Sequence, residues 1–258
     1  MRIPKKALPI WSAFFLACSL PVWAQCPFVA EAEKVEVAYV YDGDTVRLKD
    51  GRKVRLIGIN TPETSKENKP AEVFADEAAE KLSKLLSQAE VSLLLGAEKK
   101  DRYKRWLGHL FADEVLVSEY LLREGLAFHI AIPPNTRFSD CFKAAETKAE
   151  NKGLWGRNSA LRKSVSELGG RESGFRVLTG AVTSIRKIRN AYLLVIEKKL
   201  AVKVDESFVD GINLSGADQL KGREVRVRGW IKPKKASDPA HYLPWFLVIR
   251  HSSQLEWL

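Results

Sequence analysis

The sequence predicts a mainly β protein with helices, in which a five-stranded barrel is followed by a second, smaller β-barrel. Two patterns in the 258-residue chain lead to this fold class. Short segments in which apolar and polar residues alternate recur along the chain, as is typical of strands with one buried face. Apolar residues at helical spacing interrupt these strands in the N-terminal part, whereas the pattern after Gly174 is β-rich.

The first barrel and its helices are predicted in residues 25–157. Asp50 and Gly51 form a turn dipeptide that is typical of a hairpin between two strands. Five strands with interposed helices fit a five-stranded OB-type barrel with helices packed against it. The predicted strands are residues 35–40, 45–49, 53–59, 91–95 and 106–111, and the predicted helices are residues 70–87, 115–124 and 136–152.

A change of composition predicts where the first domain ends. Serine, glycine and alternating charges replace the apolar periodicity between residues 157 and 174. We therefore predict a linker over residues 158–174 and a second domain over residues 175–258.

The second domain is predicted to be a small OB-fold-like barrel, because it has five strands with an irregular stretch between the third and fourth. Loops that join strands 1–2 and 4–5 frame the oligonucleotide groove of such barrels. The domain therefore either binds a single strand or is a stabilising barrel with solvated lysines. The predicted strands are residues 175–185, 191–197, 200–204, 224–231 and 245–249. Candidate groove residues are Arg186, Lys187, Arg189, Lys232, Lys234 and Lys235, with Tyr192, Trp230 and Trp245 as stacking faces.

The first 24 residues have the pattern of a secretory signal. Basic residues precede an uncharged apolar run, residues 7–23, and Ala24 follows as a small residue at the expected cleavage site. The run is shorter than the roughly 20 residues that span a bilayer. We expect export to the periplasm or the extracellular space, no stable membrane insertion after cleavage, and a monomer. The alternative is a lipoprotein signal that would anchor the chain at Cys18.

Cysteine usage agrees with export. Of the three cysteines, Cys26 and Cys141 remain after cleavage, and a disulfide between them is expected in an oxidising compartment. Two separate buried thiols are the alternative. Neither cysteine has a second Cys or a His at metal-ligand spacing, so no zinc site is predicted.

The composition and charge indicate a folded protein with an acidic partner. A hydrophobic fraction of 45% and a charged fraction of 29% exclude a disordered or a membrane protein. The formal charge of +10 is concentrated in residues 171–258, where 16 Lys and Arg face 9 Asp and Glu. Nucleic acid and anionic lipid are the usual partners of such a surface. A generally basic, solvated surface is the alternative.

Three polar motifs occur in the first domain. Asp44 ends an Asp-Gly-Asp turn, and Arg55 interrupts an apolar strand that runs toward a cluster of oxygen-bearing side chains, residues 60–63. An arginine on a buried face requires an anion, either a protein carboxylate or a ligand phosphate. The third motif places Arg105 at a strand start. Taken singly, the motifs are also compatible with turns and an internal network of salt bridges.

Taken together, the three motifs resemble the staphylococcal nuclease family over about residues 35–155, which excludes the second domain. The resemblance implies hydrolysis of phosphodiester bonds in DNA or RNA with one calcium ion as cofactor. By position, the catalytic residues are Arg55, Glu63 and Arg105; the metal ligands are Asp44, Asn60 and the backbone carbonyl of Thr61; and the residues beside the terminal phosphate are Arg102 and Tyr103.

Two departures from the family limit what is carried over. The family usually has Asp where this chain has Asn60, so the metal site loses one negative charge and weaker calcium binding is expected. The loop after Ala127 lacks the base-stacking tyrosines, so base preference is not transferred, and His129 in this loop is expected to be a packing residue. The alternative function is a catalytically weak, nuclease-like module of the cell envelope that binds nucleic acid.

Overall fold

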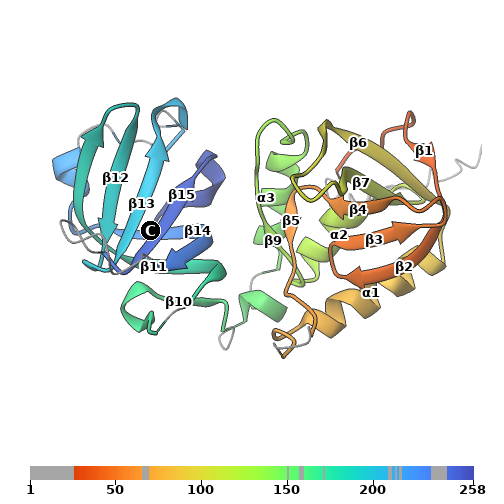
Figure 1. Cartoon of the computed structure of the whole chain (residues 1–258), viewed down its shortest axis with the longest axis horizontal. Helices are drawn as coiled ribbons and strands as arrows, with labels where there is room; N and C mark the ends of the chain where they lie inside the picture. The colour runs from red at the N-terminus through yellow and green to blue at the C-terminus, as the bar shows by residue number, and fades with distance from the viewer. Residues whose placement is uncertain are drawn as a thin grey trace, which may run out of the picture.

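A computed structural model describes residues 26–65, 70–149, 151–156, 160–170, 172–208, 211–212, 214, 217–233 and 243–258. The chain forms two β-barrels that lie side by side, with the helices on the N-terminal one (Figure 1). The predicted signal, residues 1–24, with Cys18, lies outside the described residues. Within the described ranges, no helix is long and apolar enough to cross a membrane.

The strands of the N-terminal barrel are hydrogen-bonded in the order β2, β3, β4, β7, β6, β1. Strands β2, β3 and β4 form an antiparallel meander, β4 then pairs in parallel with β7, and β7 pairs with β6. Strand β6 returns to β1, which lies just before β2 in the chain. These strands are β1 (Glu33–Lys34), β2 (Val37–Asp42), β3 (Thr45–Leu48), β4 (Lys53–Leu56), β6 (Val91–Lys100) and β7 (Trp106–Ala112). Two short strands, β5 (Ile59–Asn60) and β9 (Phe128–His129), pair beside the barrel.

Three helices cover this barrel, and each is shorter than predicted: α1 (Ala75–Ser87), α2 (Val117–Arg123) and α3 (Ser139–Thr147). Phe74 has a left-handed φ of 69°, which interrupts the helical path before α1. Val115 and Leu116 pair with β7 as β8 (Val115–Leu116), so they cannot begin α2. The helical spacing therefore located the helices, and tertiary contacts determined their ends.

The core of this barrel is tied to the N-terminal segment by a disulfide between Cys26 and Cys141 of α3. The backbone N–H of Cys26 also donates to the Glu119 carboxylate at 2.9 Å. The two cysteines are 115 residues apart in the sequence. Closing a loop of that length stabilises a fold by about 4–5 kcal/mol in the chain-entropy model.

The C-terminal barrel repeats the strand order of the first one. Strand β11 pairs with both β12 and β14, β13 pairs in parallel with β15, and β14 pairs with β15. If the five main strands of each barrel are numbered along the chain, neighbouring strands in both barrels follow the order first, second, third, fifth, fourth. These strands are β11 (Gly174–Ile188), β12 (Ala191–Ile196), β13 (Leu200–Asp205), β14 (Glu224–Pro233) and β15 (Trp245–Ile249). Two strands that the sequence did not predict are β10 (Arg162–Ser164) and β16 (Leu255–Trp257).

The predicted linker is part of the second barrel where the structure describes it. Strand β10 pairs in parallel with β11, and Val165 and Leu168 belong to the second hydrophobic core. A division of the chain at residues 158–174 therefore stays a proposal about the sequence.

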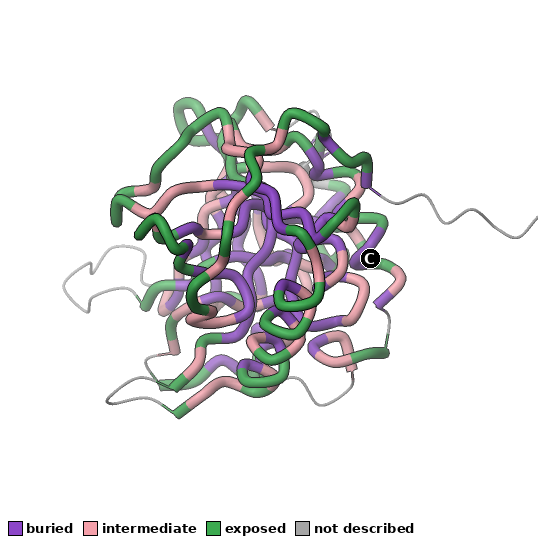
Figure 2. The backbone as a smooth tube through the Cα atoms, turned by 90° about the vertical axis from the view of Figure 1, so that its right-hand side faces the viewer, coloured by how far each residue is buried: buried purple, intermediate pink, exposed green. Residues whose placement is uncertain are grey.

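Buried residues run through the interior of the molecule, and exposed residues cover its outside (Figure 2).

A buried ion pair joins the two barrels. Arg228 of β14 donates to Glu146 of α3 at 2.6 Å, and the two side chains are only 9% and 7% exposed. Glu146 also accepts the backbone N–H of His129 at 2.7 Å. The rings of Phe128 and Phe175 pack beside the pair with centroids 5.5 Å apart. A longer ion pair, between Arg176 of β11 and Glu72 at 3.8 Å, also joins the two barrels.

Replacing Glu146 with glutamine should strongly destabilise the fold. The Glu146→Gln variant leaves the Arg228 guanidinium buried without its counter-charge, and the free energy of unfolding should fall by about 3–5 kcal/mol. Glu90→Gln is the matched control, because Glu90 pairs with Lys34 on the surface. That control should lose less than about 1 kcal/mol. Urea unfolding measures both losses, and equal losses would contradict the role assigned to the buried pair.

Two buried histidines make stability depend on pH. Burial, with Arg137 adding to it, lowers the pKa of His109 to about 3, and burial followed by Arg228 lowers the pKa of His129 to about 3. The unfolded chain binds these protons near pH 6.5, the ordinary value. The stability that depends on these two neutral histidines should therefore be fully present above about pH 6.5 and be lost progressively as the pH falls toward 3.

Urea unfolding at about pH 7.5 and about pH 5 tests this dependence. The wild type should lose more stability between the two pH values than a His109→Phe variant, which has one buried imidazole fewer. Equal losses in the two proteins would show that His109 does not titrate as described.

Candidate active site

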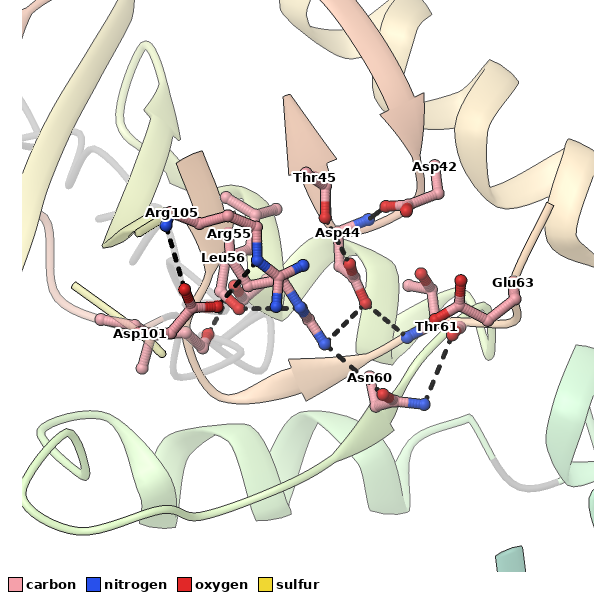
Figure 3. A network of polar contacts seen from close by, with 12 residues as sticks. Asp42, Asp44, Thr45, Arg55, Leu56, Asn60, Thr61, Glu63, Asp101 and Arg105 are labelled. Carbon is pink, nitrogen blue, oxygen red and sulfur yellow. Dashed lines mark hydrogen bonds and ion pairs between the residues drawn. The ribbon is translucent and has the colours of Figure 1, made fainter. Parts of the chain in front are cut away.

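The carboxylate of Asp44 is the centre of a buried polar network at the start of β3 (Figure 3). Its Oδ1 accepts the Thr45 hydroxyl at 3.0 Å. Its Oδ2 accepts the backbone N–H of Thr61 at 3.0 Å and lies 2.8 Å from Nη2 of Arg55. Gly43 permits this packing, because a Cβ there would lie 2.8 Å from the Thr61 side chain. The Asp-Gly-Asp turn is thereby pressed against the loop that follows β5.

Arg55 is held on the side of β4 that faces this network. Its neighbours in the strand, Val54 and Leu56, point into the core. The guanidinium donates to the Leu56 carbonyl at 3.0 Å and to Oδ1 of Asn60 at 3.4 Å. Arg55 therefore lies between Asp44 and Asn60, and its side chain is only 12% exposed.

Asn60 and Thr61 supply further oxygen atoms to the network. The pairing of β5 with β9 places Asn60 at the end of a short strand, and its amide donates to the Thr61 carbonyl at 3.3 Å. The Thr61 hydroxyl is buried and has no partner in the described part of the chain. A carboxylate, an amide oxygen and a backbone carbonyl fit a hard divalent cation, with Asp44 as the single charged donor among the three.

Asp42 is a member of this network that the sequence interpretation missed. Its carboxylate accepts the backbone N–H of Asp44 at 3.0 Å. Burial, and then the charge of Asp44, raise the pKa of Asp42 to about 7. The signal was present in the sequence as the first carboxylate of the Asp-Gly-Asp turn, but it was interpreted only as part of the turn.

Arg105 is positioned by a carboxylate four residues before it. Asp101 accepts the backbone N–H of Arg105 at 3.0 Å and its side-chain Nε at 2.8 Å. Burial acts to raise the pKa of Asp101, but the hydrogen bonds from Arg105 outweigh it and hold the pKa below its ordinary value. The side chains of Arg55 and Arg105 extend toward the same part of the network (Figure 3).

Arg102 and Tyr103 lie together on the surface of the same loop. The Arg102 guanidinium is 4.7 Å from the centre of the Tyr103 ring and donates to its hydroxyl at 2.7 Å. Tyr103 is 64% exposed. The pair is accessible to a large ligand.

Glu63 is exposed in the loop after β5. Its backbone exchanges hydrogen bonds with Glu72, whose carboxylate accepts the Glu63 N–H at 3.0 Å. Glu63 lies beside Thr61, on the side of Asp44 away from Arg105 (Figure 3). The structure thus joins Asp44, Arg55, Asn60 and Thr61 in one network, with Arg105 on one side of it and Glu63 on the other (Figure 3).

The groove predicted on the C-terminal barrel is only partly supported. Trp245 is 5% exposed and donates its indole N–H to the Glu172 carbonyl, so it cannot stack on a base. Tyr192 packs against the core, whereas Trp230 is exposed. Lys187 pairs with Glu206 at 2.6 Å. Two further groove residues, Lys234 and Lys235, lie outside the described residues.

The chain has recognisable relatives over its N-terminal barrel. The family model for staphylococcal nuclease homologues matches residues 53–157. The thermonuclease of Staphylococcus hyicus is 33% identical over 131 residues, which cover 49% of this chain and 78% of that protein. The thermonuclease of Staphylococcus intermedius is 36% identical over 125 residues, covering 47% and 74%. Endonuclease YncB of Bacillus subtilis is 31% identical over 124 residues, covering 45% and 59%.

The matched residues include Arg55, Asn60, Thr61, Glu63 and Arg105, whereas Asp42, Asp44 and Thr45 precede the first matched residue. The second barrel lies beyond residue 157, where the family match ends. From the identity and extent of these matches, the chain belongs to the staphylococcal nuclease family.

Proposed function

We propose that this protein is an exported, calcium-dependent nuclease that hydrolyses phosphodiester bonds in DNA or RNA. The observation that carries the proposal is the buried carboxylate of Asp44, which holds Arg55 next to two further oxygen donors. Relatives whose names are thermonuclease and endonuclease support it. Export rests on the signal pattern of residues 1–24.

The proposed metal ligands are the carboxylate of Asp44, the amide oxygen of Asn60 and the backbone carbonyl of Thr61. A calcium ion held by these oxygens supplies positive charge beside a non-bridging phosphate oxygen. Because Asp44 is the single charged ligand of the three, we expect this site to bind calcium weakly.

Two guanidinium groups are proposed to bind the scissile phosphate. Arg55 and Arg105 can each donate two hydrogen bonds to its equatorial oxygens, which a lysine would do less well. Asp101 holds Nε of Arg105, which orients the rest of the guanidinium. Fixed positive charge at this position stabilises the negative charge that gathers in the transition state. Arg102 and Tyr103 are proposed to contact the terminal phosphate.

Glu63 is proposed to orient or deprotonate the attacking water. Its exposed side chain is reachable by solvent, and its hydrogen bonds with Glu72 fix the backbone next to Thr61. The proton of the water would pass to the Glu63 carboxylate while the water oxygen attacks phosphorus. The phosphodiester P–O bond to the leaving group would break, and the leaving oxygen would take a proton from solvent.

A catalytically weak module that only binds nucleic acid is the second candidate. The observation that favours it is Asn60, which removes a negative charge from the proposed metal site. Against it, Arg55, Glu63 and Arg105 are all present, whereas loss of catalysis would be expected to remove at least one of them.

The Glu63→Gln variant should cleave plasmid DNA much more slowly than the wild type in the presence of calcium. Loss of a general base lowers kcat by about 10²–10⁴-fold, and Arg105→Ala should lower it by roughly 10³–10⁵-fold. Glu77→Gln, an exposed change in α1, is the matched control and should retain full activity. Excess chelator should abolish cleavage, and chelator-resistant activity or full activity in Glu63→Gln would contradict the proposal.

The Asn60→Asp variant should bind calcium more tightly, because it adds a charged ligand. Isothermal titration calorimetry with calcium alone should show a dissociation constant lowered by roughly tenfold. Asn190→Asp adds the same charge in the turn between β11 and β12 and should leave calcium affinity unchanged. If both variants changed the affinity equally, Asn60 would not be a ligand.

A further inference from the structure

A pocket of about 270 Å³ lies where the two barrels meet. Its walls come from β10, β11, β14 and a short 3-10 helix, η1 (Gly153–Trp155), that follows α3. The connection between the barrels runs through η1 and β10 (Figure 1). None of the residues that line the pocket belongs to the candidate active site.

Three neighbouring strands direct polar side chains to one face beside this pocket. Ser164 of β10 lies opposite Thr179 of β11, which lies opposite Arg226 of β14. Arg162 lies two residues from Ser164 in β10, and Arg228 lies two residues from Arg226 in β14, so these two arginines belong to the next row of paired residues on the same face. Paired residues in a sheet point to the same side, and alternate residues in a strand share a face. Three arginines and two hydroxyl residues therefore gather on one surface.

This surface holds more positive charge than its carboxylates neutralise. Glu146 pairs with Arg228 at 2.6 Å, and Glu256 pairs with Nη1 of Arg226 at 2.7 Å. Arg162 donates to a backbone carbonyl of η1 at 2.5 Å, and among the described residues no carboxylate forms an ion pair with it. Burial, and then repulsion from Arg226 and Arg228, lower the pKa of Arg162.

Two buried donors in the pocket walls also lack acceptors. Within the described ranges, Nε of Arg226 and the indole N–H of Trp155 have no hydrogen-bond partner. The Trp155 ring lies 4.9 Å from the Arg162 guanidinium and 5.3 Å from that of Arg228. Buried donors without acceptors are unfavourable, so a ligand rich in acceptor oxygens would stabilise this arrangement.

We infer that this pocket binds a phosphate group, carried by a free nucleotide or by a nucleic-acid strand. Guanidinium groups match the oxygens of a phosphate in charge and geometry, and Ser164 and Thr179 add hydroxyl groups in the same row. The volume of about 270 Å³ is at the lower edge of the roughly 300–1,000 Å³ of small-molecule sites. It suits a phosphate group better than a large apolar ligand. The site is independent of catalysis at Asp44.

Inorganic phosphate, titrated into the full-length protein with chelator present, tests the site. The indole N–H resonance of Trp155, identified with a Trp155→Phe variant, should shift and saturate in nuclear magnetic resonance spectra. Chloride at matched ionic strength should not reproduce the shift. The shift should persist in Arg105→Ala, which separates this pocket from the candidate active site. No saturating shift, an equal response to chloride, or its loss in Arg105→Ala would overturn the inference.

Removing one guanidinium should weaken the binding of inorganic phosphate. Arg226→Gln should raise the half-saturating phosphate concentration by roughly tenfold or more. Arg250→Gln removes the same charge from an exposed position of the same barrel, outside the pocket, and should change it less than twofold. If Arg226→Gln does not fold, Arg226→Lys should give an intermediate affinity. Equal affinities in the Arg226 and Arg250 variants would overturn the inference.

Two further ligands identify the source of the phosphate. If a single-stranded oligonucleotide shifts the Trp155 resonance at a lower concentration than phosphate does, the pocket binds a phosphate group of a nucleic-acid strand. A response to a nucleoside monophosphate and to phosphate alone would make it a site for a free nucleotide. Failure of phosphate to shift the resonance overturns the inference whatever the other two ligands do, and it leaves the proposed nuclease activity untouched.

Discussion

The burial of one carboxylate, that of Asp44, determines how the candidate active site is built. An ionised carboxylate inside a protein is strongly unfavourable unless charged and hydrogen-bonding partners surround it. Thr45, Arg55 and Thr61 are those partners, and they come from β3, β4 and the loop after β5. The same contacts that stabilise the buried carboxylate therefore bring Asp44, Arg55 and Thr61 together, three of the residues that the family resemblance marks as functional.

A second buried charge pair gives the molecule its two-barrel form. The contact between Arg228 and Glu146 joins β14 to α3, and the rings of Phe128 and Phe175 also pack together across the two barrels. This contact also brings Arg226 and Arg162 next to η1, where the basic pocket opens. The pocket is thus a product of the interface and has no counterpart in either barrel alone.

Local patterns in the sequence were sufficient to predict the strands and to single out several residues of the polar network around Asp44. The alternation of apolar and polar residues is a short-range property, so the five predicted strands of the second barrel match β11 to β15. The polar motifs around Asp44 and Arg55 lie in one network. Pairings between distant segments were not predictable in this way. Residues 115–116 have helical spacing but pair with β7. Trp245 is a predicted stacking face, but it is buried in the second hydrophobic core. Nothing local links Trp155 to Arg226.

In the proposed mechanism, two guanidinium groups and one cation would act on a single phosphate, with a carboxylate facing the water. A crystal structure with calcium and a nucleoside bisphosphate tests it most directly. We predict a calcium ion about 2.3–2.6 Å from the Asp44 carboxylate, with Arg55 and Arg105 on the same phosphate and Glu63 toward its solvent side. Calcium away from Asp44, or a phosphate touched by only one of the two arginines, would contradict the account.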